Sequence, residues 1–180
     1  MTAATQIPGY TTGTWTIDPV HTDVTFSVRH LGVAKVRGRF ADVQGEIVTA
    51  ENPLESTVNV TVKTASLDTN NEQRDGHVRT EEFLDVQNYP EMTFRSTGIR
   101  QDGDEYVISG ELTVRGVTKP IELRTEVGGF APEGPAGVPV LGLSASTEIN
   151  RSDFGVTGGA AGAMLGEKVK VELDVEAAKA

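Results

Sequence analysis

Histidine is the side chain best suited to transfer a proton or bind a metal near neutral pH, and this chain contains three: His21, His30 and His77. A ligand pair could be drawn from His77 with Asp75, or from His21 with Asp18 or Asp23. No HExxH motif or other zinc-ligand spacing is present, so we expect hydrogen-bonded structural histidines and no metal site. The chain has no cysteine, which excludes disulfides, thiol catalysis and cysteine-based metal sites.

The stretch Arg74-Asp75-Gly76-His77 concentrates polar functional groups. It offers no nucleophile with a recognisable base, and the GxSxG motif of serine hydrolases is absent, so we predict no catalytic residue. One interpretation is a charged pair that fixes a helical segment to the rest of the fold; the alternative is a role in contacting a ligand. The glycine-rich segment 155–166 lacks the phosphate-loop and Rossmann spacings, so we expect a flexible loop and no nucleotide cofactor.

The most cationic window of the chain lies between residues 23 and 42, where no acidic residue intervenes. It can be interpreted as a solvated strand edge. It can also be interpreted as a positive entrance for an anionic headgroup, because arginine binds phosphate and carboxylate with paired donors. The side chains concerned are Arg29, His30, Lys35, Arg37 and Arg39.

The net charge of −10 disfavours binding to a phosphate backbone, so nucleic acid is not expected as a partner. The 180 residues, of which 37% are hydrophobic and 23% charged, suit one globular domain. Residues 1–13 contain no basic residue and no apolar run, and no stretch approaches the roughly 20 apolar residues of a membrane-spanning helix. We therefore expect a soluble, cytoplasmic protein without stable membrane insertion, with a flexible segment at 1–13 and a single domain at 14–176.

Strict alternation of apolar and polar residues dominates the elements that would position these side chains. It is clear in the segment 58–63 and again in 169–175, and it is typical of antiparallel strands with one buried face. Asp102-Gly103 predicts a hairpin turn, because both residue types tolerate positive φ. Further strands are predicted at 14–17, 23–29, 37–48, 92–100, 105–114, 121–127 and 141–145.

One segment departs from this pattern. Thr69 and Glu72 have the spacing of a capping box, and Thr80 followed by two glutamates is a second candidate helix start. We therefore predict a short helical insertion near residues 70–86 that ends before Pro90.

About eight strands with one insertion predict an all-β fold, an eight-stranded antiparallel barrel, with a two-sheet sandwich as the alternative. Such a barrel either fills its interior with side chains or leaves space for one ligand. Aromatic residues make up only 6% of the chain, which favours a tunnel because Val, Ala and Gly fill less volume. A long apolar chain would suit it, since each buried CH₂ is worth about 0.8 kcal/mol.

A series of short blocks runs through the chain from residue 14 to about residue 176. It begins with Trp15-x-Ile17-Asp18-x-x-His21 and Phe26-x-Val28-Arg29-His30, and continues with Gly38-Arg39-Phe40, Ala65-Ser66-Leu67-Asp68-Thr69, Arg74-Asp75-x-His77 and Phe83. Tyr89-Pro90-x-x-x-Phe94-x-Ser96-Thr97 follows, then Gly110-x-Leu112-Thr113-Val114-Arg115-Gly116-Val117-Thr118-Lys119-Pro120, and finally Asn150-Arg151-x-Asp153-Phe154-Gly155. In this series the sequence resembles the YceI-like, polyisoprenoid-binding family.

The resemblance implies a lipocalin-like barrel whose hydrophobic tunnel takes a long isoprenoid, such as a prenyl diphosphate or a quinone tail, or another amphiphile. It implies no catalytic residue and no cofactor, and it allows a homodimer, since relatives often look dimeric. Many relatives carry a signal peptide and act in the periplasm, a feature that residues 1–13 lack. The ligand-contacting side chains it implies, as hypotheses, are Phe26, Val28, His30, Phe40, Arg74, Asp75, His77, Phe83, Phe94 and Phe154.

Three functions follow as hypotheses. The leading one is non-enzymatic binding, transport or storage of a polyisoprenoid or similar amphiphile. The first rival is a lipid-acting hydrolase or isomerase that uses His77 or His30 with an acidic partner. The second rival is a structural or interaction barrel with a filled core.

Overall fold

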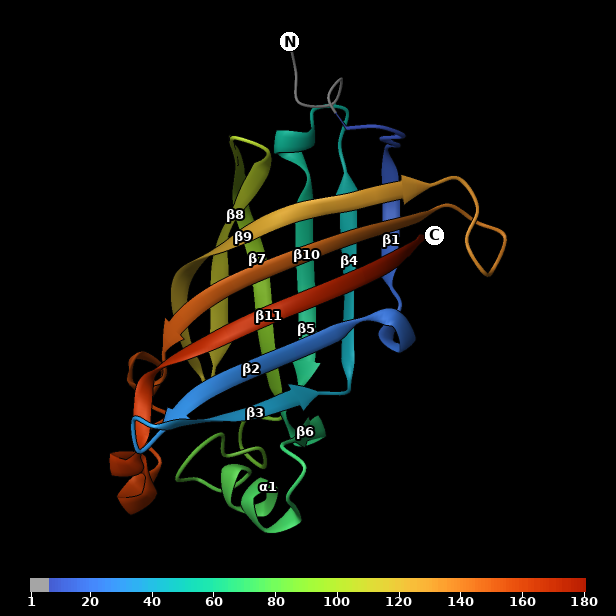
Figure 1. Ribbon diagram of the computed structural model, residues 1–180. Coiled ribbons are helices and arrows are strands. Elements are labelled where there is room, and N and C mark those ends of the chain that lie inside the picture. The colour runs from blue at the N-terminus through green and yellow to red at the C-terminus, as the bar shows by residue number, and fades with distance from the viewer. Residues whose placement is uncertain (1–6) are drawn as a thin grey trace.

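The computed structural model describes residues 7–180, and most of them belong to β-strands (Figure 1). The strands are β1 (Gly13–Ile17), β2 (Asp23–His30), β3 (Ala34–Phe40), β4 (Val43–Thr49), β5 (Thr57–Lys63), β6 (Leu67–Asp68), β7 (Glu91–Asp102), β8 (Glu105–Val114), β9 (Val117–Ala131), β10 (Val140–Asn150) and β11 (Leu165–Lys179). The helices within this range are α1 (Glu72–Val78) and the short 3₁₀ helices η2 (Pro19–His21), η3 (Pro53–Glu55), η4 (Thr64–Ser66), η5 (Arg151–Phe154) and η6 (Gly159–Met164).

The strands close into a barrel. Hydrogen bonding runs in the order β1-β4-β5-β7-β8-β9-β10-β11 and returns from β11 to β1. The long strand β11 pairs with β1 through its last residues and with β2 through its first, so β2 continues the line of β1. In the same way β3 extends β4, and β6 extends β5. The predicted eight-stranded antiparallel barrel is confirmed, and the sandwich alternative is excluded because the wall closes on itself.

Three neighbouring strands are interrupted where these paired segments meet. The interruptions are η2, the two residues 41–42, and η4. Hydrogen bonds join residues 41–42 to η4 and to the end of β5: the Ala41 amide donates to the Ser66 carbonyl at 3.3 Å, and the Lys63 amide donates to the Asp42 carbonyl at 3.0 Å. The strand predicted over 37–48 is therefore two strands that meet at a bend, which alternation alone did not reveal.

The insertion between β6 and β7 contains α1 followed by turns. Asn71 caps the helix, since its side chain accepts from the Arg74 amide at 2.9 Å. The predicted capping box is wrong, because the Thr69 hydroxyl donates to Asp75 instead. No second helix begins at Thr80, where consecutive turns follow. β6 pairs with β3 and not with β7. The insertion that follows β6 lies over the end of the barrel at which β3 and β6 are found (Figure 1).

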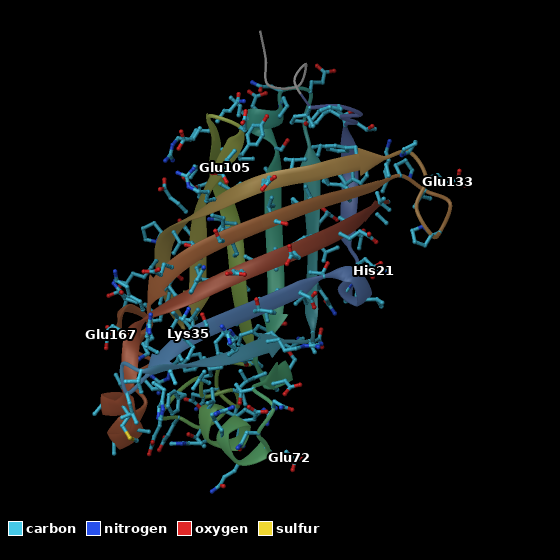
Figure 2. The ribbon with its side chains drawn as sticks, in the orientation of Figure 1. His21, Lys35, Glu72, Glu105, Glu133 and Glu167 are labelled. Atoms are coloured by element: carbon cyan, nitrogen blue, oxygen red, sulfur yellow. The ribbon has the colours of Figure 1, made fainter. Side chains whose placement is uncertain are left out.

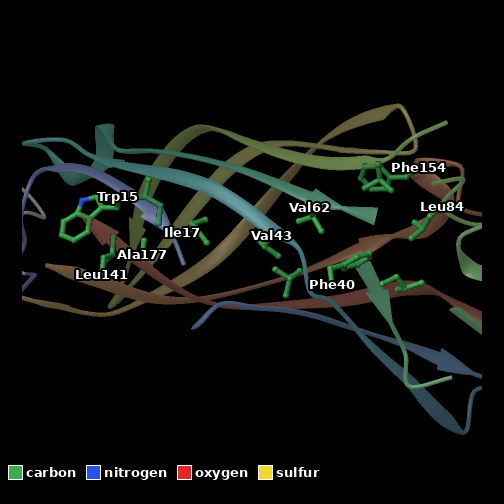
Figure 3. Close-up of a cluster of buried hydrophobic side chains, with 13 residues drawn as sticks. Trp15, Ile17, Phe40, Val43, Val62, Leu84, Leu141, Phe154 and Ala177 are labelled. Atoms are coloured by element: carbon green, nitrogen blue, oxygen red, sulfur yellow. The ribbon is translucent and has the colours of Figure 1, made fainter. Parts of the chain in front are cut away.

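The opposite end of the barrel is sealed by aromatic side chains. Trp15 is fully buried; its Nε1 donates to Thr49 Oγ1 at 2.8 Å, and its ring meets Phe130 edge-on at 5.5 Å. Tyr10 packs against the same phenylalanine at 5.3 Å. We call this region, formed by Tyr10, Trp15, Thr49 and Phe130, the sealed end. Figure 3 shows the buried cluster extending from Trp15, Ile17, Leu141 and Ala177 to Phe40, Leu84 and Phe154.

The predicted domain limits can be compared with the described part of the chain. Of the segment 1–13, predicted to be flexible, residues 1–6 lie outside the described residues. Within the remainder, the Tyr10 hydroxyl donates to the Ala50 carbonyl, and Gly13 already belongs to β1. At the other terminus β11 continues past 176 to Lys179.

Candidate functional site

The barrel encloses a cavity of about 740 Å³ toward the end that carries α1 and η6. This volume lies within the roughly 300–1,000 Å³ that is typical of small-molecule sites. Most of its wall is formed by the side chains that point inward at every second position of the strands. This wall is largely aliphatic. Its members include Val60, Leu112, Ile121, Leu123, Val169, Val171 and Leu173.

Two phenylalanine rings in this wall pack over buried glycines of a neighbouring strand. A Cβ at Gly38 would lie 2.4 Å from Phe26 Cζ, and a Cβ at Gly110 would lie 2.4 Å from Phe94 Cζ. Phe26 and Gly38 are direct partners across β2 and β3. Each glycine therefore leaves room in the wall for a ring that would otherwise project further into the lumen.

Several residues that line the cavity are exposed to solvent, and they cluster at α1 and η6. The polar ones offer amide, guanidinium and imidazole groups, whereas the thioether of Met164 is apolar. We call the opening that they border the mouth. The residues are Asn71, Gln73, Arg74, His77 and Met164.

Thr69 organises the polar stretch at the start of α1. The buried Asp75 accepts from the Thr69 amide at 2.9 Å and from its hydroxyl. Arg74 donates from Nε to Thr69 Oγ1 at 2.8 Å and from Nη2 to the Thr69 carbonyl at 2.6 Å. No ion pair between Arg74 and Asp75 occurs in the described chain, so the expected charged pair is wrong: both side chains bind Thr69. The consequence is a fixed position for Arg74 at the mouth.

The other two predicted polar residues of the site are histidines. His77 Nε2 donates to Glu82 Oε2 at 2.8 Å, and its ring packs edge-on against Phe83 at 5.1 Å. His30, the last residue of β2, also lines the cavity. Its ring has no hydrogen-bond partner among residues 7–180. An imidazole oriented by a carboxylate can act as a general base, so His77 is the more plausible of the two for proton transfer.

Nearly all of the predicted ligand contacts are brought together by the fold. Nine of the ten line the cavity, and Asp75 is the exception, since it lies behind the wall on Thr69. Their contact with a ligand remains a prediction. The nine are Phe26, Val28, His30, Phe40, Arg74, His77, Phe83, Phe94 and Phe154.

The cationic window does not form the entrance to the cavity. Along β2 and β3 its members alternate with Val28 and Val36, which line the cavity, so they project from the outer face. The interpretation as a positive entrance is wrong for these side chains, and His30 is the window's contribution to the lining. Figure 2 shows Lys35 on the outer surface of the β2–β3 hairpin. The exposed members are Arg29, Lys35, Arg37 and Arg39.

Arg151 is a site residue that the sequence analysis did not single out. It is buried and lines the cavity, and its guanidinium donates to five backbone carbonyls at distances of 2.7–3.2 Å. This network holds the segment 155–166, which had been expected to be a flexible loop. Its only sequence signal was its place in the last of the YceI-like blocks. The carbonyls belong to Val156, Thr157, Gly162, Leu165 and Gly166.

A separate cluster of titratable groups lies at the bend between β1 and β2. His21 Nδ1 donates to Asp18 Oδ2 at 2.8 Å and is 3.3 Å from Glu176 Oε2. The hydrogen bond to Asp18, with the nearby charge of Glu176, raises the pKa of His21, and the same bond lowers the pKa of Asp18. Because both carboxylates face one ring nitrogen, the arrangement is an ion-pair cluster that ties η2 to β11.

No helix within residues 7–180 combines the length and the apolar character needed to cross a bilayer.

Comparison with known proteins places the chain in a family. The model of the YceI-like domain matches residues 15–177. A UPF0312 protein of Photorhabdus laumondii is 42% identical over 135 residues, which cover 74% of this chain and 70% of that protein. Protein YceI of Salmonella arizonae is 41% identical over 138 residues, covering 76% and 72%.

Solved structures agree with this assignment. A YceI protein of Campylobacter jejuni is 33% identical and has a TM-score of 0.73, with 97% of this chain and 99% of that one covered. A polyisoprenoid-binding domain from Saccharophagus degradans shares the fold at a TM-score of 0.72 and 15% identity, covering 94% and 100%. The extent of these matches shows that the chain belongs to the YceI-like family.

Proposed function

We propose that this protein binds a long-chain polyisoprenoid, such as a prenyl diphosphate or an isoprenoid quinone, or a similar amphiphile, without catalysing its conversion. The observation that carries the proposal is the cavity of about 740 Å³, which is aliphatic along its wall and polar at its mouth. The family relationship supports it, and so does the description of the Saccharophagus degradans neighbour as a polyisoprenoid-binding domain.

The wall accounts for recognition of the chain. Each CH₂ group moved from water into such a lining contributes about 0.8 kcal/mol, so a long tail binds without specific polar contacts. Such a wall selects for length and flexibility more than for a particular functional group. Storage or transport of a family of related tails therefore suits it better than recognition of one small polar molecule.

The mouth accounts for recognition of the headgroup. Arg74 uses Nε and Nη2 on Thr69, and its Nη1 has no partner among residues 7–180. A guanidinium positioned in this way can donate to a diphosphate oxygen or a quinone carbonyl. Asn71 and Gln73 add amide groups at the same opening.

Mass spectrometry of lipids extracted from the natively purified protein tests the proposal directly. We expect an isoprenoid or related amphiphile in wild type and in Glu172→Trp, whose side chain is exposed, but not in Val171→Trp, which fills the cavity from the adjacent position of β11. Empty extracts from wild type, together with no thermal shift on adding prenyl diphosphates or quinones, would contradict it and favour the filled barrel.

The enzymatic alternative rests on the His77–Glu82 hydrogen bond of 2.8 Å at the mouth. It predicts that the protein converts a prenyl diphosphate and that His77→Ala abolishes product formation. Binding without catalysis predicts that wild type returns the lipid unchanged, as judged by mass spectrometry after prolonged incubation. Product formation that His77→Ala abolishes would overturn the non-enzymatic part of the proposal.

A further inference from the structure

An exposed apolar patch adjoins the mouth. Leu31 and Val33, in the turn between β2 and β3, are 60% and 82% exposed, and Met164 at the end of η6 is 45% exposed. The Leu31 amide donates to the Met164 carbonyl at 2.8 Å, which joins the hairpin turn to η6 (Figure 1). We call these three residues the apolar tip.

The positive φ of Leu31 indicates that this leucine is not needed for folding. Leu31 has a φ of 55° and Gly32 a φ of 70°, the pair of positive values that characterises a type I′ turn. Asn, Asp or Gly is preferred at the first of these positions, because a leucine side chain is strained there. A strained residue whose side chain is left in water stabilises neither the turn nor the core, which points to a role outside folding.

Unpaired cations flank the apolar tip. Arg29 and Lys35 are partners across β2 and β3, are both exposed, and have no ion pair among the described residues. The nearby Glu167 is engaged, since it accepts from Ser152 and lies 3.6 Å from Arg151. The tip therefore presents apolar side chains with free positive charge beside them, on a chain whose net charge is −10.

The apolar tip is continuous with the cavity. Met164 belongs both to the tip and to the cavity lining, and its neighbour Leu165 lines the cavity as the partner of His30 on β2. A molecule leaving the cavity past Met164 would therefore pass along the apolar side chains of the tip. Figure 2 places Lys35 and Glu167 at this end of the barrel, with Glu105 and Glu133 at the other.

We propose that the apolar tip docks on an anionic lipid bilayer and turns the mouth toward it. Leu31, Val33 and Met164 enter the boundary between headgroups and acyl chains, while Arg29 and Lys35 contact the anionic headgroups. This rests on the proposed function for its purpose, which is exchange of the cavity's cargo with the membrane. The unpaired Arg29 and Lys35 beside the apolar side chains complement a bilayer with anionic headgroups.

Flotation with vesicles tests the docking itself. Vesicles containing equal parts of phosphatidylglycerol and phosphatidylcholine should carry wild-type protein, and pure phosphatidylcholine vesicles should carry far less. Leu31→Asn combined with Val33→Ser should weaken binding about tenfold or more, because fully burying one such side chain is worth about that factor. Val20→Ser is the matched control: Val20 is 83% exposed but lies in η2, beyond the opposite end of β2.

The Leu31→Asn change separates docking from a structural role. Asparagine suits the positive φ of 55°, so the single variant should keep or raise the thermal unfolding temperature while it weakens vesicle binding. A variant that binds vesicles as wild type does would overturn the proposal. So would weaker binding that merely follows a loss of folded protein.

The cations are tested in the same assay. Arg29→Gln with Lys35→Gln should reduce binding by about fivefold per residue at low salt, the equivalent of roughly 1 kcal/mol for each cation near an anionic surface. Arg100→Gln with Arg124→Gln removes the same number of charges from side chains already paired with Glu122, Asp102 and Glu105, and should have little effect. Equal effects of the two pairs would show that net charge, and not the tip, governs binding.

Two further results distinguish a failure of membrane docking from a failure of the proposed function. Wild type that carries an extracted lipid but ignores anionic vesicles overturns docking and leaves the proposed function intact. Wild type that binds vesicles through the tip, but carries no extracted lipid and shows no thermal shift with prenyl diphosphates or quinones, supports docking and contradicts the proposed function. Sedimentation that shows a wild-type dimer, dissociated by Leu31→Asn with Val33→Ser, would assign the tip to a subunit interface and overturn the proposal.

Discussion

The sealed end and the cavity end of this barrel are made by the same alternating strands, yet one is packed and the other is hollow. At the sealed end Trp15 is fully buried and hydrogen-bonds to Thr49 on the neighbouring strand β4. At the cavity end the aromatic rings stay against the wall, where Gly38 accommodates Phe26. The difference shows that alternation selects the face that is buried, whereas the size and direction of a few inward side chains decide whether the space is filled.

The largest expected effect on stability follows from removing the Trp15 side chain at the sealed end. Trp15→Ala should lower the free energy of unfolding by about 3–5 kcal/mol, because it leaves a large void and removes the hydrogen bond from the indole to Thr49. Phe26→Ala, in the cavity wall, should lower it by only about 1–2 kcal/mol, since one side of that ring already faces open space. Urea denaturation measures both, and equal losses would mean that the two ends are equally packed.

The second-largest expected effect concerns Arg151, which holds the segment 155–166 at the cavity end. Arg151→Met should lower the free energy of unfolding by about 2–3 kcal/mol, because it removes charge-assisted hydrogen bonds to five carbonyls of the segment 156–166. Hydrogen exchange should accelerate in that segment and not around Trp15. Exchange that accelerates uniformly over both ends would argue against a local role for Arg151.

A smaller effect tests how the cavity is kept open. Gly38→Ala should drive the Phe26 ring inward and weaken binding of a fluorescent isoprenoid about tenfold, a change of roughly 1.4 kcal/mol in binding free energy. The control is Gly142→Ala in β10, where an added Cβ would meet no atom nearer than 3.9 Å. Similar loss of affinity in both variants would show that the ring position is not what preserves the space.

The smallest effect lies at the bend that separates the two ends. Asp18 and Glu176 raise the pKa of His21, so its contribution to stability is complete below the unfolded value of 6.5 and is lost as pH rises through the folded value. His21→Gln should therefore destabilise the protein more near pH 6 than near pH 9, as judged by denaturation midpoints. A loss that is the same at both pH values would exclude a charged His21 as its cause.

Much of the fold could be predicted because its signals are local. Period-two alternation depends only on which face of a strand is wet, and the segments 58–63 and 169–175 where it is clear lie within β5 and β11. The strand predicted at 105–114 has the bounds of β8. Helix capping was harder, because Thr69 and Asn71 are both suitable caps and the choice depended on Asp75 accepting from Thr69. The bend at residues 41–42 depends on hydrogen bonds to β5 and Ser66, which no local pattern encodes.

The candidate site divides in the same way. Alternation and the YceI-like blocks selected side chains such as Phe26 and Phe94, and the fold places them around one cavity. Of the two interpretations of the cationic window, the structure supports the solvated strand edge, because Arg37 and Arg39 are exposed on the face of β3 opposite to Phe40, which lines the cavity. Arg151 was missed because its partners are backbone carbonyls, which leave no trace in side-chain composition.

The sequence by itself determined an antiparallel barrel of the YceI-like family, because alternation and the order of the motifs do not depend on how individual side chains pack. Only the tertiary structure decided where the interior is empty, which histidine is oriented by a carboxylate, and that Leu31, Val33 and Met164 meet beside the mouth. The physical reason is that a void, a hydrogen bond between distant segments and a surface patch are properties of strand register and closure. Residues far apart in the chain create them together.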